Sequence, residues 1–133
     1  MAKSKWIWIR EDVVYAIHKR QLAEHGGLDG VRDRTLLESA MARPINLALC
    51  ERGRVDIADL SSAYAAGIAK NHPFVDGNNR TAHVLYQLFL ELNGYFNEWT
   101  NHQKYQAMLQ LAAGDINEAQ FSSLLQSTLK RRN

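Results

Sequence analysis

The sequence is poor in cysteine, in net charge and in long apolar runs. Cys50 is the only cysteine among 133 residues, which excludes an internal disulfide, a CxxC redox pair and a thiolate-rich zinc site. Sixteen basic residues against fourteen acidic ones do not give the strongly basic balance of a dedicated nucleic-acid binder. No apolar run is long enough to cross a bilayer, and the first residues lack a signal-peptide cleavage site. We therefore expect a cytoplasmic protein with no membrane contact and no direct nucleic-acid partner.

Proline is also scarce, with two residues in the chain, and most of the sequence has the apolar spacing of helices. A length of 133 residues suits a single domain that covers residues 1–133. Apolar residues recur at helical spacing in six segments, which predicts an all-α protein, a compact bundle of about six helices. The segments are residues 11–24, a short helix capped by Asp33 that ends before Pro44, residues 58–71, residues 79–93, one helix before Gly114 and one capped by Asn117 with Gln120.

Three other segments have less regular patterns. Residues 5–9 are aromatic and β-branched, which predicts one short strand, and residues 95–99 ("YFNEW") are expected to form a small strand beside it. Residues 44–57 show no clear period and contain Gly53, so we expect a mobile surface loop or flap there. The segment 79–93 is apolar nearly all round, which predicts a central, buried helix.

The start of that helix is chemically unusual. It lies in the segment "NHPFVDGNNRTAHVLYQLFLELNGY", residues 71–95, and its first turn contains Arg80 where acidic residues are expected. Gly77 lets backbone N–H groups face a ligand closely, and Asn78 adds an amide donor. Arg80 can form a fork of hydrogen bonds to phosphate oxygens. The free N–H groups of a helix start then predict a phosphate site.

Two further residues of this loop are candidates for a metal ligand and a proton acceptor. Asp76 is placed to hold Mg²⁺ that bridges the same phosphates, since magnesium prefers one or two carboxylates with phosphate and water. An imidazole is the usual group for taking a proton from an attacking hydroxyl, and His72 supplies one at the opposite edge of the loop. Taken singly, these residues are more often a cap, a turn, a solvated acid or a surface ion pair. Their occurrence together within nine residues favours a functional site.

The segment "HPFVDGNNR" resembles the signature of the Fic/Doc family, which reads His-Pro-Phe-x-Asp/Glu-Gly-Asn-Gly/Lys-Arg. The segments "GGLDGVRDRTLLESAMARP" and "TAHVLYQLFLELNGY" are similar to the death-on-curing (Doc) branch, so the resemblance covers nearly the whole chain. It implies a helical bundle with the motif loop between two helices and a flap beside it. It also implies a bacterial toxin that transfers the γ-phosphate of ATP to a Ser or Thr hydroxyl, in Doc a threonine of elongation factor Tu. A Phd-type antitoxin with a flexible tail would restrain it.

The resemblance also assigns roles to individual positions. His72 matches the general base and Asp76 the magnesium ligand. The positions that match nucleotide- or phosphate-binding residues are Lys70, Gly77, Asn78, Asn79 and Arg80. Members that transfer AMP have Gly at position 79 and Doc members have Lys, so Asn79 leaves the transferred group open. His83 stands where many AMP-transferring members have a second Arg, which favours the Doc branch.

The sequence is compatible with three functions. The first is transfer of the γ-phosphate of ATP to a protein hydroxyl, and the second is transfer of AMP. The third is an inactive relative that only binds the antitoxin and modulates its DNA binding. A helix-turn-helix regulator is disfavoured by the near-neutral charge and the lack of a basic recognition helix.

Overall fold

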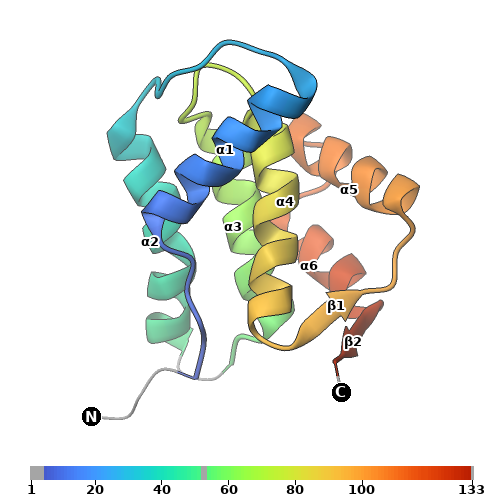
Figure 1. Cartoon of the computed structure of the whole chain (residues 1–133). Coiled ribbons are helices and arrows are strands. Elements are labelled where there is room, and N and C mark those ends of the chain that lie inside the picture. Colours follow the sequence, from blue (N-terminus) through green and yellow to red (C-terminus); the bar gives the residue numbers. More distant parts are fainter. Residues whose placement is uncertain (1–4, 52–53, 133) are drawn as a thin grey trace.

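Helices dominate the computed structural model, which describes residues 5–51 and 54–132 (Figure 1). Its elements are α1 (Glu11–His25), α2 (Arg34–Glu51), α3 (Ile57–Asn71), α4 (Asn78–Leu92), β1 (Tyr95–Asn97), α5 (Asn101–Ala113), α6 (Glu118–Gln126) and β2 (Leu129–Arg131). The predicted all-α bundle with one small β element is confirmed. In the described ranges, no helix combines the length and the apolar character that a membrane span needs.

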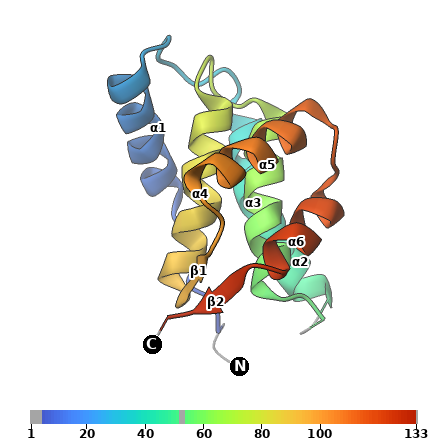
Figure 2. The same ribbon diagram turned by 90° about the vertical axis from the view of Figure 1, so that its right-hand side faces the viewer.

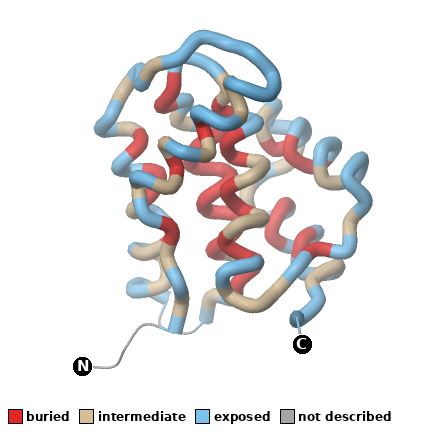
Figure 3. The backbone as a smooth tube through the Cα atoms, in the orientation of Figure 1, coloured by how far each residue is buried: buried red, intermediate tan, exposed pale blue. Residues whose placement is uncertain are grey.

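Helix α3 forms the centre of the bundle. Figure 1 shows α3 and α4 side by side, with α1 and α2 on one side and α5 and α6 on the other. Viewed from the α5–α6 side, these two helices lie in front of that central pair (Figure 2). Small residues let neighbouring helices approach closely, and a Cβ added at Gly67 would lie only 3.2 Å from the Cβ of Ala40 in α2. Buried residues therefore concentrate along α3 and the facing side of α4 (Figure 3).

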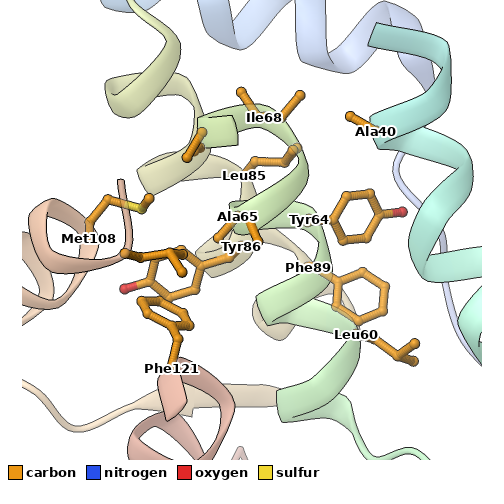
Figure 4. Close-up of a cluster of buried hydrophobic side chains, with 14 of the residues drawn as sticks. Ala40, Leu60, Tyr64, Ala65, Ile68, Leu85, Tyr86, Phe89, Met108 and Phe121 are labelled. Carbon is orange, nitrogen blue, oxygen red and sulfur yellow. The ribbon is translucent and has the colours of Figure 1, made fainter. Parts of the chain in front are cut away.

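The prediction that residues 79–93 are buried all round is wrong in part. Helix α4 is central, but its outer side is partly accessible and Leu92 is 40% exposed. Its inner side carries Tyr86 and Phe89, which belong to the aromatic core (Figure 4). The ring of Phe89 lies 5.1 Å from that of Tyr64, and Tyr86 meets Phe121 edge-on at 5.3 Å. These contacts join the second half of α4 to α3 and α6, so the helix that begins at the motif loop is packed into the core.

Helix α2 corrects the prediction of a short helix and a long flap. It does not end before Pro44 but continues to Glu51 with a buried Pro44 inside it. A proline loses only one backbone hydrogen bond in a helix, and here its ring is buried together with Ala40 and Met41, which stabilises the continuing helix. Residues 44–51 are therefore helical, and Asp56 already caps α3. Gly53, part of the predicted flap, lies outside the described residues.

The strand predicted at residues 5–9 is absent from the described structure, where residues 5 and 6 form a bend and residues 7–9 have no regular structure. Its backbone bonds to side chains: Ile7 N donates to Asn93 Oδ1 at 2.8 Å, and Ile7 O accepts from Asn93 Nδ2 at 3.1 Å. Ile9 N donates to the hydroxyl of Tyr64 at 3.1 Å. Because these side chains satisfy the backbone, no partner strand is needed.

The strand predicted within residues 95–99 exists but has a different partner. Strand β1 pairs antiparallel with β2, with Tyr95 opposite Arg131 and Asn97 opposite Leu129. Leu129 continues the apolar spacing of Phe121 and Leu125, which predicts that the last helix includes it, but α6 ends at Gln126 and Leu129 belongs to β2. Apolar spacing alone could not distinguish a last helical turn from a short strand there.

Candidate active site

A cleft of about 520 Å³ opens at the start of α4. One wall is formed by the end of α1 with the two glycines after it, and the other by His72 and residues 75–80. In Figure 1 these parts lie at the top of the bundle, where the loops before α2 and α4 meet. All of the site residues expected from the sequence line this cleft except Lys70, which is exposed on the last turn of α3. The fold thus gathers the motif around one cavity.

His72 has an unusual backbone at the rim of the cleft. It follows the end of α3 with φ 49° and ψ 55°, and it is the one non-glycine residue with positive φ in the described ranges. Such a conformation costs on the order of 1–3 kcal/mol and is found preferentially at functional sites. The side chain is exposed and has no hydrogen bond or ion pair to other described residues. The imidazole is thus free to meet a substrate.

The loop behind His72 is fixed by a buried aromatic ring. Phe74 is 1% exposed and stacks on His18 of α1 at 3.8 Å, with Tyr15 edge-on at 6.2 Å. His18 Nε2 donates to the backbone oxygen of Asp76 at 2.8 Å. The supporting role of His18 was not predicted from the sequence, and the only signal for it was a histidine on the apolar face of a predicted helix. His18 and Phe74 together hold the loop before α4 against α1.

The side chain of Asn78 also stabilises the loop, through two hydrogen bonds to its backbone. Its Oδ1 accepts from Phe74 N at 3.0 Å, and its Nδ2 donates to Phe74 O at 2.9 Å. The side chain is buried, so it closes the loop and presents little to the cleft. What Asn78 can offer an anion is chiefly its backbone N–H at the first turn of α4.

The start of α4 has free donors. Gly77, at φ 76°, has no side chain to cap the helix, and the N–H of Thr81 is the first to bond back, to Gly77 O at 3.0 Å. The backbone N–H groups of residues 78–80, which come before Thr81 in the helix, can therefore bind a ligand. Arg80 extends from the same turn, is exposed, and has no ion pair among the described residues. An unpaired guanidinium at a positive helix end indicates an anion site.

Asp76 is held as a carboxylate beside these donors. Its Oδ1 accepts from Gly77 N at 2.8 Å and its Oδ2 from Leu28 N at 3.3 Å. These hydrogen bonds, with a smaller contribution from the charge of Arg80, lower the pKa of Asp76 below its ordinary value. Each oxygen keeps a lone pair, which suits Mg²⁺. The described ranges contain no group of three His, Cys, Asp or Glu side chains that could hold a metal, so its other ligands would be phosphate oxygens and water.

A second cavity of about 540 Å³ adjoins the cleft and lies between α1, α4 and α5. Both cavities are lined by His25, Asn79 and Arg80, which therefore lie at the boundary between them. The remaining lining residues are more apolar in character: Gln21, His83, Tyr105, Met108 and Leu109. Burial, with a contribution from Lys104, lowers the pKa of His83, so this imidazole is neutral at neutral pH. The two neighbouring cavities thus differ in character, since the cleft is lined mainly by polar and charged residues and the second cavity is more apolar.

Comparisons with known proteins agree with this arrangement. The model of the Fic/DOC family matches residues 8–90. The chain is 38% identical over 85 residues to "Toxin Doc" of Mycolicibacterium smegmatis, which covers 64% of this chain and 62% of that protein. It is 30% identical over 86 residues to "Protein kinase doc" of Escherichia phage P1, covering 65% of this chain and 68% of that protein. The chain thus spans about two thirds of the length of these relatives. It belongs to the Fic/DOC family and, within it, to the death-on-curing (Doc) branch.

Proposed function

We propose that the protein is a Doc-like toxin of a bacterial cytoplasm that transfers the γ-phosphate of ATP to a Ser or Thr hydroxyl of a protein. Elongation factor Tu is the first candidate target, and its phosphorylation would stop translation and growth. One observation carries the proposal: an exposed, unpartnered His72 stands at the rim of a cleft that contains free helix N–H groups, Arg80 and an ionised Asp76. The names of the relatives, "Toxin Doc" and "Protein kinase doc", support it.

The cleft would bind the triphosphate through fixed donors. The backbone N–H groups at the first turn of α4 and the guanidinium of Arg80 face the phosphate oxygens. Asp76 would hold Mg²⁺, which neutralises charge on the phosphates when bound. Because the loop is already anchored by Phe74 and Asn78, these donors need little rearrangement to stabilise the charge of the transferring phosphoryl group.

The transfer step itself needs one proton acceptor. The imidazole of His72 takes the proton from the target hydroxyl, and the hydroxyl oxygen forms a bond to the γ-phosphorus. The bond from the γ-phosphorus to the oxygen that bridges it to the β-phosphate breaks, and ADP leaves with that oxygen. His72 then releases its proton to solvent. The products are ADP and a phosphorylated Ser or Thr.

The second cavity supports transfer of the γ-phosphate over transfer of AMP. Its apolar lining, with Tyr105 and Met108, suits a nucleoside base. With the base there, the α-phosphate would lie at the boundary between the two cavities, beside His25, Asn79 and Arg80. The γ-phosphate is then the group that extends furthest into the cleft toward His72. Transfer of AMP would need the reverse direction of the nucleotide.

Two labelled forms of ATP test the proposed activity. The purified protein, with Mg²⁺ and a bacterial lysate, is given ATP labelled at the α- or the γ-phosphorus. We expect a labelled protein band from the γ-label alone, and no band with His72→Ala. A band from the α-label would show AMP transfer instead. If neither label is transferred and the induced wild type harms growth no more than His72→Ala, the inactive antitoxin-binding alternative is favoured.

We also propose that a separate, Phd-type antitoxin with a flexible tail restrains the protein. Tyr105 and Leu109, at the mouth of the second cavity, are 55% and 39% exposed, so an apolar tail segment that folds there would cover them. The product of the neighbouring short reading frame is the first candidate. It should co-purify with this protein and restore growth on co-expression, and a charge introduced by Leu109→Glu should weaken both effects.

Replacement of Asp76 by asparagine should remove most of the magnesium-dependent activity. The amide keeps an acceptor for Gly77 N but has no charge for the metal. Metal contributions of several kcal/mol to transition-state stabilisation correspond to a rate loss of about a hundredfold or more. The loss should be partly recovered at high Mg²⁺ concentration. The initial rate of γ-label transfer against Mg²⁺ concentration measures both effects.

The matched control for this test is Asp29→Asn. Asp29 is an exposed carboxylate of the neighbouring loop that accepts from Gly30 N at 2.8 Å and does not line the cleft. Its replacement should leave the magnesium dependence unchanged. Because the pKa of Asp76 is lowered, its carboxylate stays ionised down to a lower pH than an ordinary one, so an acid limb of the rate near neutral pH would not come from Asp76. An Asp76→Asn variant with the wild-type dependence on Mg²⁺ would exclude this carboxylate as the metal ligand.

A further inference from the structure

We propose that Arg32 is a positioning residue that holds His72 in its orientation at the cleft rim. The inference rests on the proposed role of His72 as the proton acceptor. Arg32 lies in the loop between α1 and α2, forty positions before His72 in the sequence. Its Nε donates to His72 O at 2.7 Å, and one of its terminal nitrogens donates to Asn71 O at 2.8 Å. The guanidinium thus spans the end of α3.

The backbone carbonyls of Asn71 and His72 are well suited to accept hydrogen bonds from the guanidinium of Arg32. The last carbonyls of a helix have no partner within the helix, and they lie at the negative end of its dipole. A guanidinium is charged at all relevant pH values and offers parallel donors that can engage two acceptors at once. A lysine ammonium would keep the charge but not the two-pronged geometry. Arg32 therefore satisfies the end of α3 in a way that fixes its direction.

The backbone around Arg32 makes the clamp rigid. The N–H groups of Arg32 and Asp33 both donate to Pro73 O, at 2.7 and 3.0 Å. Asp33 is itself fixed, because its Oδ1 accepts from Leu36 N at the start of α2. Val75 N donates to Gly30 O at 3.0 Å on the other side of the loop. Residues 30–33 thus run along residues 73–75, and the guanidinium reaches from this base to His72.

The clamp explains how His72 keeps a strained backbone without side-chain support. The left-handed φ of 49° would relax if the carbonyl of His72 were free to turn, and the imidazole would turn with it. The imidazole has no partner of its own in the described ranges, so its direction depends on the backbone. Arg32 does not line the cleft. Its loss should therefore affect the transfer step and leave nucleotide binding nearly unchanged.

Steady-state kinetics of three variants test this. Arg32→Met and Arg32→Lys should each lower kcat by about ten- to a hundredfold, because a small misplacement of a reacting group has effects of that size. The KM for ATP should stay within about twofold of the wild type, since ground-state binding is untouched. The matched control is Arg34→Met, two positions on, whose exposed guanidinium pairs with Glu38 at 3.1 Å and Glu11 at 3.8 Å instead of with the end of α3. It should leave both constants unchanged.

A second readout does not depend on activity. In protein labelled with ¹³C-histidine, the ring signal of His72, assigned with His72→Asn, should shift or broaden in both Arg32 variants and stay unchanged in Arg34→Met. A wild-type kcat together with an unaltered His72 signal would overturn the proposal. So would a raised KM at unchanged kcat, which would make Arg32 a nucleotide contact. If Arg32→Met does not fold, Arg32→Lys decides by the same two readouts. If the wild type transfers no phosphate, the proposed function fails, while the His72 signal still decides whether Arg32 positions it.

Discussion

Replacing His72 by asparagine is expected to lower the rate of phosphate transfer by about 10²–10⁴-fold, the range that a general base contributes. Asparagine removes the imidazole but tolerates the left-handed backbone at φ 49° better than alanine does. The side chain of His72 is exposed and outside the core, so the melting temperature should hardly change. Initial rates of γ-label transfer, with thermal melting followed by circular dichroism, measure both quantities.

His102→Asn is the control for this first prediction. His102 is exposed at the start of α5 and lines neither the cleft nor the second cavity. Its replacement should leave the rate at the wild-type value. If His72→Asn also kept the wild-type rate, the imidazole at the rim would have no part in proton transfer, and the mechanism would need another base.

Phe74→Ala should destabilise the fold by about 3–5 kcal/mol, as is typical when a buried Phe is truncated. The ring is 1% exposed and stacks on His18 at 3.8 Å, so its loss leaves a cavity beneath the motif loop. A typical domain is stable by only about 5–15 kcal/mol, so a large part of the stability would be lost. Urea unfolding, followed by circular dichroism, gives the change in the free energy of unfolding.

The neighbouring residue gives the control for this second prediction. Val75 is 49% exposed, and Val75→Ala should change the stability by no more than about 0.5 kcal/mol. Because the ring anchors the motif loop to α1 through His18, an alanine variant that still folds should hold this loop less firmly and bind ATP more weakly. A Phe74→Ala protein as stable as Val75→Ala would mean that the loop is not anchored through this ring.

The helix boundaries that depend on local chemistry were predictable. Asn117 and Gln120 were expected to cap the last helix, and each side chain accepts from the other's backbone N–H at 2.8 Å. Capping is decided within four residues, so the sequence contains all the partners. The course of α2 through Pro44 and the pairing of β1 with β2 depend on packing between distant segments. These were among the places where prediction from the sequence was wrong.

The same distinction holds for the site. The motif residues from His72 to Arg80 were predicted together because they are contiguous, and the structure places them around one cleft. The residues that hold the motif were missed, because His18 and Arg32 reach it from 58 and 40 positions away. Lys70 was expected at the site from the family resemblance alone, and the structure places it outside the cleft. The contiguous motif thus identified the residues that line the cleft, but not the distant residues that hold the motif in place.

The central claim is that the start of α4 binds the phosphates of Mg²⁺-bound ATP beside His72. Titration of ¹⁵N-labelled protein with Mg²⁺ and ATP tests it most directly, with inorganic triphosphate as a second probe. We expect saturable shifts of the backbone amides of residues 77–80 with both probes, and shifts at Tyr105 and Met108 with ATP alone. Arg80→Met should weaken both titrations by tenfold or more, as expected for a charged hydrogen bond worth about 1.5–3 kcal/mol. Amides of residues 77–80 that do not respond to saturating ATP would contradict the account.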